Sequence, residues 1–255
     1  MVWEPYLLEL CDVGKRFGGL TALEGVSFGV RRGEVRGIIG PNGAGKTTLF
    51  HLITGELRPT SGKILMEGED ITGLRPYSIC RKGIGRTFQL TLIFPEMTVL
   101  DCVWAGVNAR STGLWKRLLW GSRHKDDATR VAMEIIRQVG LEERAHELVS
   151  NLSYGDQKVL EIAMALSTRP RILLLDEPTQ GVGPQEAAEI LRLIKKLSAN
   201  TTIMLIEHDM NMIRGVCDIV TVLHFGRVIA EGTWTEISMN EEVQMIYLGE
   251  RWWIS

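Results

Sequence analysis

The sequence has no long apolar run of the kind that a membrane-spanning helix requires. In this chain of 255 residues, no window approaches the roughly 18 consecutive apolar side chains that indicate a transmembrane helix. Residues 1–5, Met-Val-Trp-Glu-Pro, carry neither the basic cluster nor the apolar stretch of a signal peptide. We therefore expect a chain that is not exported and does not itself cross a membrane.

Excess charge of one sign and clustered cysteines are also missing. The formal net charge is −2 at pH 7, which gives no support for broad electrostatic binding, so we expect no nucleic-acid partner. The cysteines lack C-x-x-C spacing and predict neither a zinc site nor a disulfide framework. We expect them to be buried, reduced and inert, as suits the cytoplasm. They are Cys11, Cys80, Cys102 and Cys217.

What the sequence does contain is a glycine-rich loop at residues 40–47, Gly-Pro-Asn-Gly-Ala-Gly-Lys-Thr. It matches the phosphate-binding pattern G-x-x-x-x-G-K-[ST]. Residues 34–39 predict a short buried strand before it and 48–53 predict a helix after it, which is the context that the pattern requires. Glycines let successive N–H groups point at phosphate oxygens, and the helix adds the positive end of its dipole. The loop predicts a site for a nucleoside triphosphate.

Two side chains of this loop have predicted roles of their own. Lys46 is expected to reach the β and γ phosphates, and the Thr47 hydroxyl is expected to bind Mg²⁺. The residues expected around the phosphates are Gly40, Pro41, Asn42, Gly43, Ala44, Gly45, Lys46, Thr47 and Thr48.

Strand and helix patterns alternate along most of the chain and predict an α/β fold. Segments 6–13 and 22–30, joined by a glycine-rich turn, predict an antiparallel β-layer beside the nucleotide core, and 62–71 predicts a hairpin. The continuous apolar run at 171–175 is typical of a strand that helices cover on both faces, and 202–206 predicts a further strand. We expect a mainly parallel sheet with helices on both sides.

The stretch from about 90 to 150 differs, because strand signals stop and helical periodicity takes over. Val131, Ile135 and Val139 fall four residues apart, which is typical of one buried helix face. We therefore expect a single domain, 1–255, with an inserted helical subdomain. Its predicted parts are an α/β nucleotide-binding core at 1–89 and 157–255 and the helical subdomain at 90–156.

Ionisable side chains follow two of the predicted strands. Asp176 and Glu177 stand where 171–175 ends, at the carboxyl edge where open α/β sheets bind ligands. There Asp176 can hold Mg²⁺ and Glu177 can polarise the attacking water. His208 follows 202–206 and could contact the γ phosphate, and its neighbours Glu207 and Asp209 could cap the next helix. Taken alone, the acidic pair also fits a helix cap or solvated turn, and the histidine a structural role; the phosphate loop favours the catalytic interpretation.

Two further sites have open alternatives. Phe17 lies in the turn after the first strand, where its ring could stack on an adenine or simply pack against the protein. Ser153 and Gly155 precede a predicted helix at 156–167 and form either a plain helix cap or a second anion site. Because Lys46 already serves one phosphate site, a second site would meet the nucleotide of another subunit.

Taken together, the motifs resemble those of the ATP-binding subunit of ABC transporters. They are, in chain order, Phe17, the loop at 40–48, Gln89, the segments 152–156 and 173–178, and His208. The resemblance identifies these as the adenine platform, Walker A, Q-loop, signature motif, Walker B with its glutamate, and switch histidine. It implies a RecA-like P-loop NTPase core that binds and hydrolyses ATP with Mg²⁺.

The same resemblance implies a distribution of roles. It places Gln89 with Thr47 and Asp176 at Mg²⁺, and the residues that it implies for catalysis are Lys46, Gln89, Glu177 and His208. Ser153 and Gly155 should touch the γ phosphate held by a partner subunit.

The chain departs from the family pattern at three positions. The signature motif usually reads Leu-Ser-Gly-Gly-Gln, but Tyr154 and Asp156 stand at two of its positions. Asp156 brings a negative charge near the expected ATP sandwich, which weakens dimer closure unless its side chain faces away. Gly183 stands where the D-loop normally has an aspartate, which puts communication across the dimer in doubt but not hydrolysis itself.

Several stretches are similar to the ATPases of branched-chain amino-acid importers, namely 85–89, 96–99, 160–163, 206–210 and 247–250. The ATPases of urea and short-amide importers share much of this pattern. A lipopolysaccharide-export ATPase, or a soluble ABC ATPase of a non-transport assembly, remains as an alternative.

As an importer ATPase, the chain is expected to lie peripherally on the cytoplasmic face of the inner membrane. It would form a homodimer, or a heterodimer with a second ABC ATPase, and would bind two membrane permeases and, indirectly, a periplasmic or lipid-anchored solute-binding protein. The expected permease contact is the segment 89–97, where Leu92, Ile93 and Phe94 could instead be buried. The segment Trp115–Trp120 could approach the bilayer or pack as a helical corner.

Overall fold

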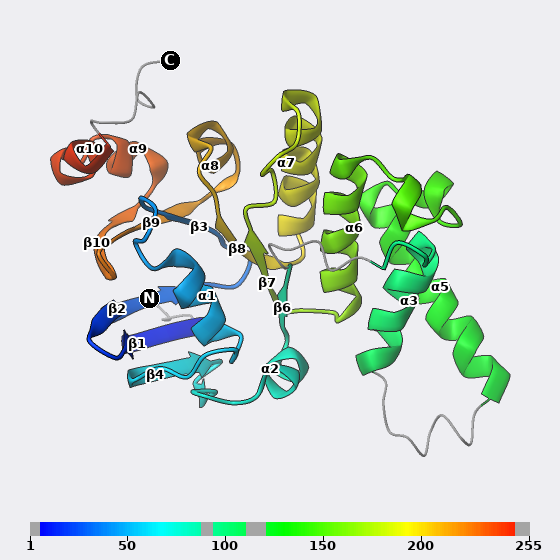
Figure 1. Cartoon of the computed structure of the whole chain (residues 1–255), viewed down its shortest axis with the longest axis horizontal. Helices are drawn as coiled ribbons and strands as arrows, with labels where there is room; N and C mark the ends of the chain where they lie inside the picture. Colours follow the sequence, from blue (N-terminus) through cyan, green and yellow to red (C-terminus); the bar gives the residue numbers. More distant parts are fainter. Residues whose placement is uncertain (1–5, 88–93, 111–120, 248–255) are drawn as a thin grey trace, which may run out of the picture.

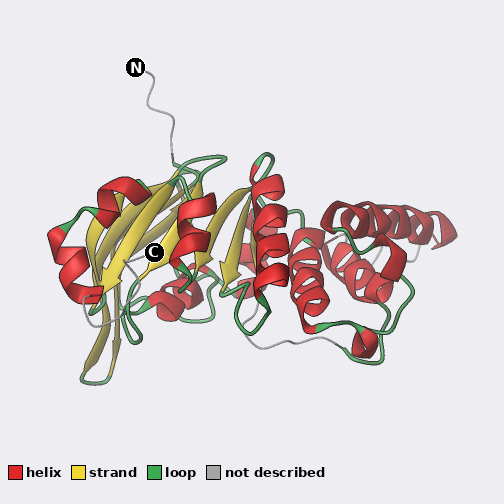
Figure 2. Cartoon of the chain, turned by 90° about the horizontal axis from the view of Figure 1, so that it is seen from above, coloured by secondary structure: helices red, strands yellow, loops and turns green. Residues whose placement is uncertain are grey.

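The computed structural model describes residues 6–87, 94–110 and 121–247, which form two β-sheets with helices packed against and beside them. Figures 1 and 2 show the sheets at one end of the elongated molecule and a group of helices at the other. Within the described ranges, no helix combines the length and apolar character needed to cross a bilayer.

The larger sheet contains six strands: β3 Val35–Ile39, β6 Ile84–Arg86, β7 Ile172–Asp176, β8 Thr202–Ile206, β9 Ile219–His224 and β10 Arg227–Gly232. Their order is β10-β9-β3-β8-β7-β6, and all neighbours are parallel except β9 and β10. Alternate residues of β7 enter two different cores, with Leu173 in one and Leu174 in the other. Burial on both faces explains the continuous apolar runs, and the expected mainly parallel sheet is confirmed.

The smaller sheet contains four antiparallel strands: β1 Leu8–Phe17, β2 Leu20–Val30, β4 Ser61–Met66 and β5 Glu69–Asp70. Their order is β2-β1-β4-β5. The pairing of β1 with β2 runs from Leu8 opposite Val30 to Phe17 opposite Leu20, so Phe17 lies at the tip of a long hairpin. The antiparallel layer expected from the sequence is confirmed, with strands longer than predicted.

Helices of the α/β part flank the larger sheet (Figure 1). They are α1 Lys46–Ile53, α2 Pro76–Lys82, α7 Pro184–Ser198, α8 Met210–Val216, α9 Trp234–Ser238 and α10 Glu241–Tyr247. Helix α1 follows β3 after the phosphate loop and buries Leu49 and Phe50 against the sheet. Helix α7 is amphipathic, and its apolar face buries Ile190 and Ile194 in the other core. These apolar stripes fix each helix on the sheet and thereby fix the loops at the carboxyl ends of the strands.

The remaining helices are α3 Val99–Arg110, α5 Gly121–Val139 and α6 Tyr154–Ser167, with 3-10 turns at Glu142–Arg144 and Val149–Asn151. Ala132 and Ile136 of α5 are fully buried, as the helical periodicity predicts. Helix α6 packs against both α3 and α5 and against β6 and β7, so it joins this helical group to the larger sheet. Among the described residues of this helical group, the β-pairing is limited to an isolated antiparallel bridge between Thr98 and Leu148. The division into two parts at 90 and 156 stays a prediction.

The cysteines do not all follow the expected pattern of burial. Cys102 is buried, but Cys11, Cys80 and Cys217 are each partly exposed, so the expectation of burial is wrong for these three. Cys11 lies on the face of β1 opposite the buried Leu8 and Leu10, and Cys80 lies on the short helix α2. Cys217 packs against the larger core as a partly buried side chain.

Candidate nucleotide-binding site

The phosphate loop joins the carboxyl end of β3 to the first turn of α1. Gly43 and Gly45 have φ angles of +80° and +104°, a region that favours glycine, and a Cβ on Gly45 would lie 2.6 Å from Leu23 Cδ2. The Nζ of Lys46 donates to the carbonyl oxygens of Gly40 at 2.6 Å and Pro41 at 3.1 Å. The ammonium is therefore already folded over the loop, beside backbone N–H groups at a helix N-terminus, which is an arrangement suited to phosphate.

Asp176, the last residue of β7, is held by the strand beside it. Its side chain has no exposed surface, and its Oδ2 accepts a 2.8 Å bond from Arg86 Nη2 at the end of β6. Its backbone N–H donates to Thr87 Oγ1 at 3.2 Å. Burial raises the pKa of the Asp176 carboxyl above its usual range, while the Arg86 guanidinium acts in the opposite direction.

The other carboxylate oxygen of Asp176 supplies a test for the expected Mg²⁺. This Oδ1 is buried and has no hydrogen-bond partner in the described part of the chain. Carboxylate and hydroxyl oxygens are the ligands that Mg²⁺ prefers, and Thr47 lies in the first turn of α1 and is partly exposed. The residues present therefore fit a divalent cation.

Glu177 and His208 meet directly at the carboxyl edge of the sheet. Glu177 Oε1 lies 3.0 Å from His208 Nε2, although they are 31 residues apart. Glu177 has a φ of +49°, a region that non-glycine residues seldom adopt, and its N–H donates to the carbonyl of Ile206 at 3.0 Å. Such strain persists only where surrounding contacts hold it, and it is typical of functional sites. The arrangement can hold a carboxylate in place to orient and polarise a water.

A pocket of about 670 Å³ contains this pair and the phosphate loop residue Asn42. Glu207, Thr179 and Asp209 also line it. The structure therefore brings together the loop after β3, the loop after β7 and the loop after β8, as expected for side chains that follow parallel strands.

Glu207 is a residue of this site whose role the sequence did not reveal. We expected it to cap the next helix, and this expectation is wrong: its Oε1 accepts bonds from Thr179 N at 3.0 Å and Thr179 Oγ1 at 2.6 Å, and its Oε2 from His208 N at 3.0 Å. Asp209 alone caps α8. Glu207 thus ties the loop of Glu177 to the loop of His208. An acid between an apolar strand and a histidine was the available signal.

Ser153 and Gly155 lie at the N-terminus of α6 and do not line the pocket that holds Glu177. Ser153 Oγ accepts the N–H of Asp156 at 3.1 Å, so the plain helix cap is present. The same hydroxyl donates to Asp156 Oδ2 at 2.7 Å, and Arg144 Nη1 pairs with that oxygen at 2.8 Å. The charge that Asp156 adds to the signature motif is therefore paired with a cation of the same chain.

Gly183 lies close to the signature motif. Glu186 of α7 accepts its N–H at 3.1 Å, and a Cβ on Gly155 would lie 2.6 Å from the Oε1 of the same Glu186. Glu186 therefore contacts both the start of α7 and the start of α6, and it links the two segments where the sequence departs from the family pattern.

Phe17 projects from the tip of the β1–β2 hairpin with 43% of its surface exposed. The Nζ of Lys15 lies 4.9 Å from its ring centroid. The ring is not part of either core, and the Lys15 ammonium lies over one of its faces; the exposed remainder can meet a planar ligand. Gln89, Leu92 and Ile93 lie outside the described residues, as does the segment Trp115–Trp120.

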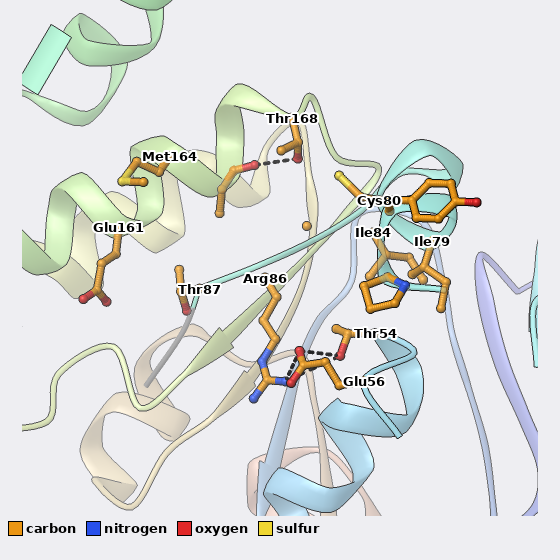
Figure 3. A pocket seen from close by; sticks show the side chains of 14 residues that line it. Thr54, Glu56, Ile79, Cys80, Ile84, Arg86, Thr87, Glu161, Met164 and Thr168 are labelled. Carbon is orange, nitrogen blue, oxygen red and sulfur yellow. Dashed lines mark hydrogen bonds and ion pairs between the residues drawn. The ribbon is translucent and has the colours of Figure 1, made fainter. Parts of the chain in front are cut away.

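A second pocket, of about 370 Å³, lies between α2, β6 and α6 (Figure 3). Figure 3 shows Ile79 and Cys80 on one wall and Glu161 and Met164 on the other, with Arg86 pointing toward Glu56 and Thr54. Thr87, one of the lining residues, directly precedes in the chain the segment that contains Gln89.

Comparison with known protein families gives one match, which covers more than half of the chain. Residues 23–180 match the family described as ABC transporter. This range begins in β2 and includes the phosphate loop, the signature segment, Asp176 and Glu177.

Curated proteins are similar over nearly the full length. The high-affinity branched-chain amino acid transport ATP-binding protein BraF of Pseudomonas aeruginosa is 41% identical over 251 residues, which cover 96% of this chain and 98% of BraF. The protein of the same description named LivG, from Salmonella typhimurium, is 42% identical over 250 residues, which cover 96% of this chain and 98% of LivG.

Solved structures show the same architecture. The ADP conformation of MJ1267, an ATP-binding cassette of an ABC transporter, superposes with a TM-score of 0.85 at 32% identity and covers 97% of this chain and 100% of MJ1267. A dimeric post-hydrolysis state of the ATP-binding cassette MJ0796, bound to ADP and Pi, gives a TM-score of 0.74 at 27% identity and covers 89% of this chain and 98% of MJ0796.

Proposed function

The chain belongs to the ABC transporter family and is an ATPase of that family, and we propose that it powers an importer for branched-chain amino acids. The observation that carries this proposal is the identity of 41–42% with BraF and LivG along 96% of the chain. The paired loops of Glu177 and His208 beside the phosphate loop support the hydrolytic part.

Within one subunit, the described residues divide the work on ATP. Lys46 and the N–H groups at the start of α1 hold the phosphates, and Glu177, fixed by His208 and by the Ile206 carbonyl, orients the attacking water. Phe17 offers its exposed ring to the adenine. Such chemistry consists of positioning and of stabilising charge on the transferred phosphoryl group.

Thr47 and Asp176 would hold Mg²⁺, and Gln89 is proposed as a further ligand on the family pattern. The cation would supply charge neutralisation to the phosphate oxygens. The buried, unbonded Oδ1 of Asp176 supports this assignment.

A second ATPase subunit is required to complete the proposed site. Ser153 and Gly155 open α6 and are not among the residues that line the pocket of Glu177, which supports a role toward the nucleotide of another subunit. We propose that two subunits, identical or related, close head to tail so that each signature motif reaches the nucleotide of the other. The dimeric MJ0796 cassette supports such an assembly.

The membrane contact is proposed at the pocket between α2, β6 and α6. It lies where the helical group meets the larger sheet, so relative movement of the two would change its shape. Thr87 of its lining directly precedes the segment 88–93 in the chain, and Phe94, with 59% of its surface exposed, follows that segment. In a dimer, each subunit would bind one permease at this pocket. The two permeases would hold the ATPase on the cytoplasmic face of the inner membrane, with a solute-binding protein on the opposite side.

Affinity isolation of the tagged chain from detergent-solubilised membranes tests this function. We expect two membrane permeases to copurify, and we expect the reconstituted complex to carry leucine, isoleucine or valine at the expense of ATP. Copurification with lipopolysaccharide-assembly proteins, or with soluble proteins only, would leave the ATPase in place and overturn the importer assignment. Transport of urea or short amides instead would overturn the substrate class alone.

A further inference from the structure

Arg86 is a buried cation that contacts two acids from different elements, one at the end of β7 and one after the end of α1. Only 5% of its side chain is exposed. Its Nη2 donates to Asp176 Oδ2 at 2.8 Å, and its Nη1 donates to Glu56 Oε1 at 3.1 Å. Glu56 in turn accepts a 3.0 Å bond from Thr54 Oγ1 just after α1. The guanidinium thus bridges the end of β7 and the end of the helix that begins at the phosphate loop.

The charge balance around Asp176 makes this contact important. The Asp176 side chain has no exposed surface, and an ionised carboxylate buried without a counter-ion is strongly unfavourable. Among the described residues, Arg86 is the cation that forms an ion pair with Asp176. When the proposed metal is absent, Arg86 is therefore what compensates the buried negative charge.

The geometry also allows the contact to be exchanged. The two bonds use separate nitrogens, so Arg86 can keep Glu56 while its bond to Asp176 weakens. The Cζ of Arg86 lies 5.8 Å from the ring centroid of Phe50, which packs along the arginine and limits where it can move. The guanidinium therefore has an acidic partner both while it is bonded to Asp176 and after that bond weakens.

We propose that Arg86 is a positioning residue that neutralises and orients Asp176 in the nucleotide-free protein and yields that carboxylate when Mg²⁺ enters with the nucleotide. The inference rests on the proposed Mg²⁺·ATP site. Arg86 also lines the pocket between α2, β6 and α6. A shift of Arg86 when the metal binds would therefore change the wall of that pocket. By the reciprocity of linked equilibria, an occupant of the pocket that shifts Arg86 also changes the affinity for Mg²⁺.

Thermal unfolding of Arg86→Met and wild type tests the proposal. The melting temperature of each is measured with EDTA, with a non-hydrolysable ATP analogue and EDTA, and with the analogue and Mg²⁺. With EDTA we expect Arg86→Met to melt about 10 °C below wild type, as for a broken buried ion pair. With Mg²⁺ and the analogue we expect less than half of that difference, and the Mg²⁺ concentration that gives half of the shift should be lower in the variant.

Arg36→Met is the matched control. Arg36 is equally buried, on β3, and pairs with Glu34 at 2.6 Å and Glu231 at 2.8 Å, away from Asp176. Its loss of melting temperature should be the same with and without Mg²⁺. Arg86→Lys keeps the charge but not the two-pronged geometry, so it should show a smaller deficit that Mg²⁺ again reduces; it serves in place of Arg86→Met if that variant does not fold.

The outcomes separate the inference from the function on which it rests. A deficit in Arg86→Met that is the same in all three conditions, or a deficit in Arg36→Met that Mg²⁺ reduces equally, would show that Arg86 is merely structural. If Mg²⁺ and the analogue fail to stabilise the wild type, the proposed nucleotide site itself is wrong.

Discussion

Glu177 Oε1 lies 3.0 Å from His208 Nε2, so the side chains that follow β7 and β8 are already joined within one subunit. Glu207 connects the loops that carry this pair, because it accepts hydrogen bonds from Thr179 and from the His208 N–H. On the proposed function, the carboxylate that orients water is therefore positioned before a second subunit arrives, and the second subunit would add the contact to the γ phosphate.

Glu177→Gln should abolish most hydrolysis and keep ATP binding. The amide cannot act as a base, and loss of such a group typically slows hydrolysis about 10²–10⁴-fold. With ATP, the variant should accumulate as a closed dimer. Steady-state ATPase assays and size-exclusion chromatography check this, with Glu189→Gln on the exposed face of α7 as the control. Undiminished turnover in Glu177→Gln would exclude its assigned role.

Glu207→Ala should lower both stability and turnover. Removing this buried acceptor leaves the Thr179 N–H and hydroxyl and the His208 N–H without their partner, which lowers the free energy of unfolding by about 1–3 kcal/mol. Urea unfolding measures the first effect and kcat the second. Asp209→Ala removes the cap of α8 instead, at about 1 kcal/mol, and should leave kcat closer to wild type. Equal kcat values for the two variants would mean that Glu207 does not hold the catalytic loops.

Arg144→Ala should weaken the ATP-bound dimer. Asp156 would then face the nucleotide of the second subunit without its cation, and a partly exposed pair of this kind contributes up to about 1 kcal/mol, or about fivefold in affinity. Sedimentation of the Glu177→Gln dimer measures this change. Adding Asp156→Gln should restore the dimer, whereas Arg137→Ala, which breaks the exposed pair with Glu142, should not affect it. No rescue by Asp156→Gln would exclude charge repulsion as the cause.

Phe17→Ala should weaken ATP binding, and Phe17→Tyr should not. Loss of stacking on a base typically costs about 1–3 kcal/mol, and the exposure of this ring favours the lower end. Leu20→Ala, on the same hairpin tip with 68% of its surface exposed, is the control. Titration with a fluorescent ATP analogue gives the dissociation constants. Equal weakening by Leu20→Ala would point to the hairpin as a whole and not to the ring.

Local spacing was sufficient to predict the elements that hold the nucleotide. The strand before the phosphate loop, the helix after it and the buried strand ending at Asp176 all lie within about two residues of their predicted bounds. Each is defined by a short pattern, such as glycines between an apolar run and a helix, that needs no distant partner to form.

Several contacts of the site could not be predicted in this way. Glu207 was expected to cap α8, yet it bonds Thr179, which is 28 residues away. Arg86 and Asp176 are 90 residues apart in the chain, and they meet only because β6 and β7 are neighbours in the sheet. The short segments that form β10, α9 and α10 carry weak periodicity, and their pattern alone did not predict these elements.

The sequence by itself determined the chemistry: the phosphate loop at 40–47, the acidic pair at the end of β7, the histidine after β8 and the serine that caps α6. Only the tertiary structure decided which of these act together. Parallel strand order places the loops of Glu177 and His208 in contact, and the position of α6 keeps Ser153 out of their pocket. Local patterns depend on neighbours in the chain, whereas the partners of a buried charge depend on which strands lie side by side.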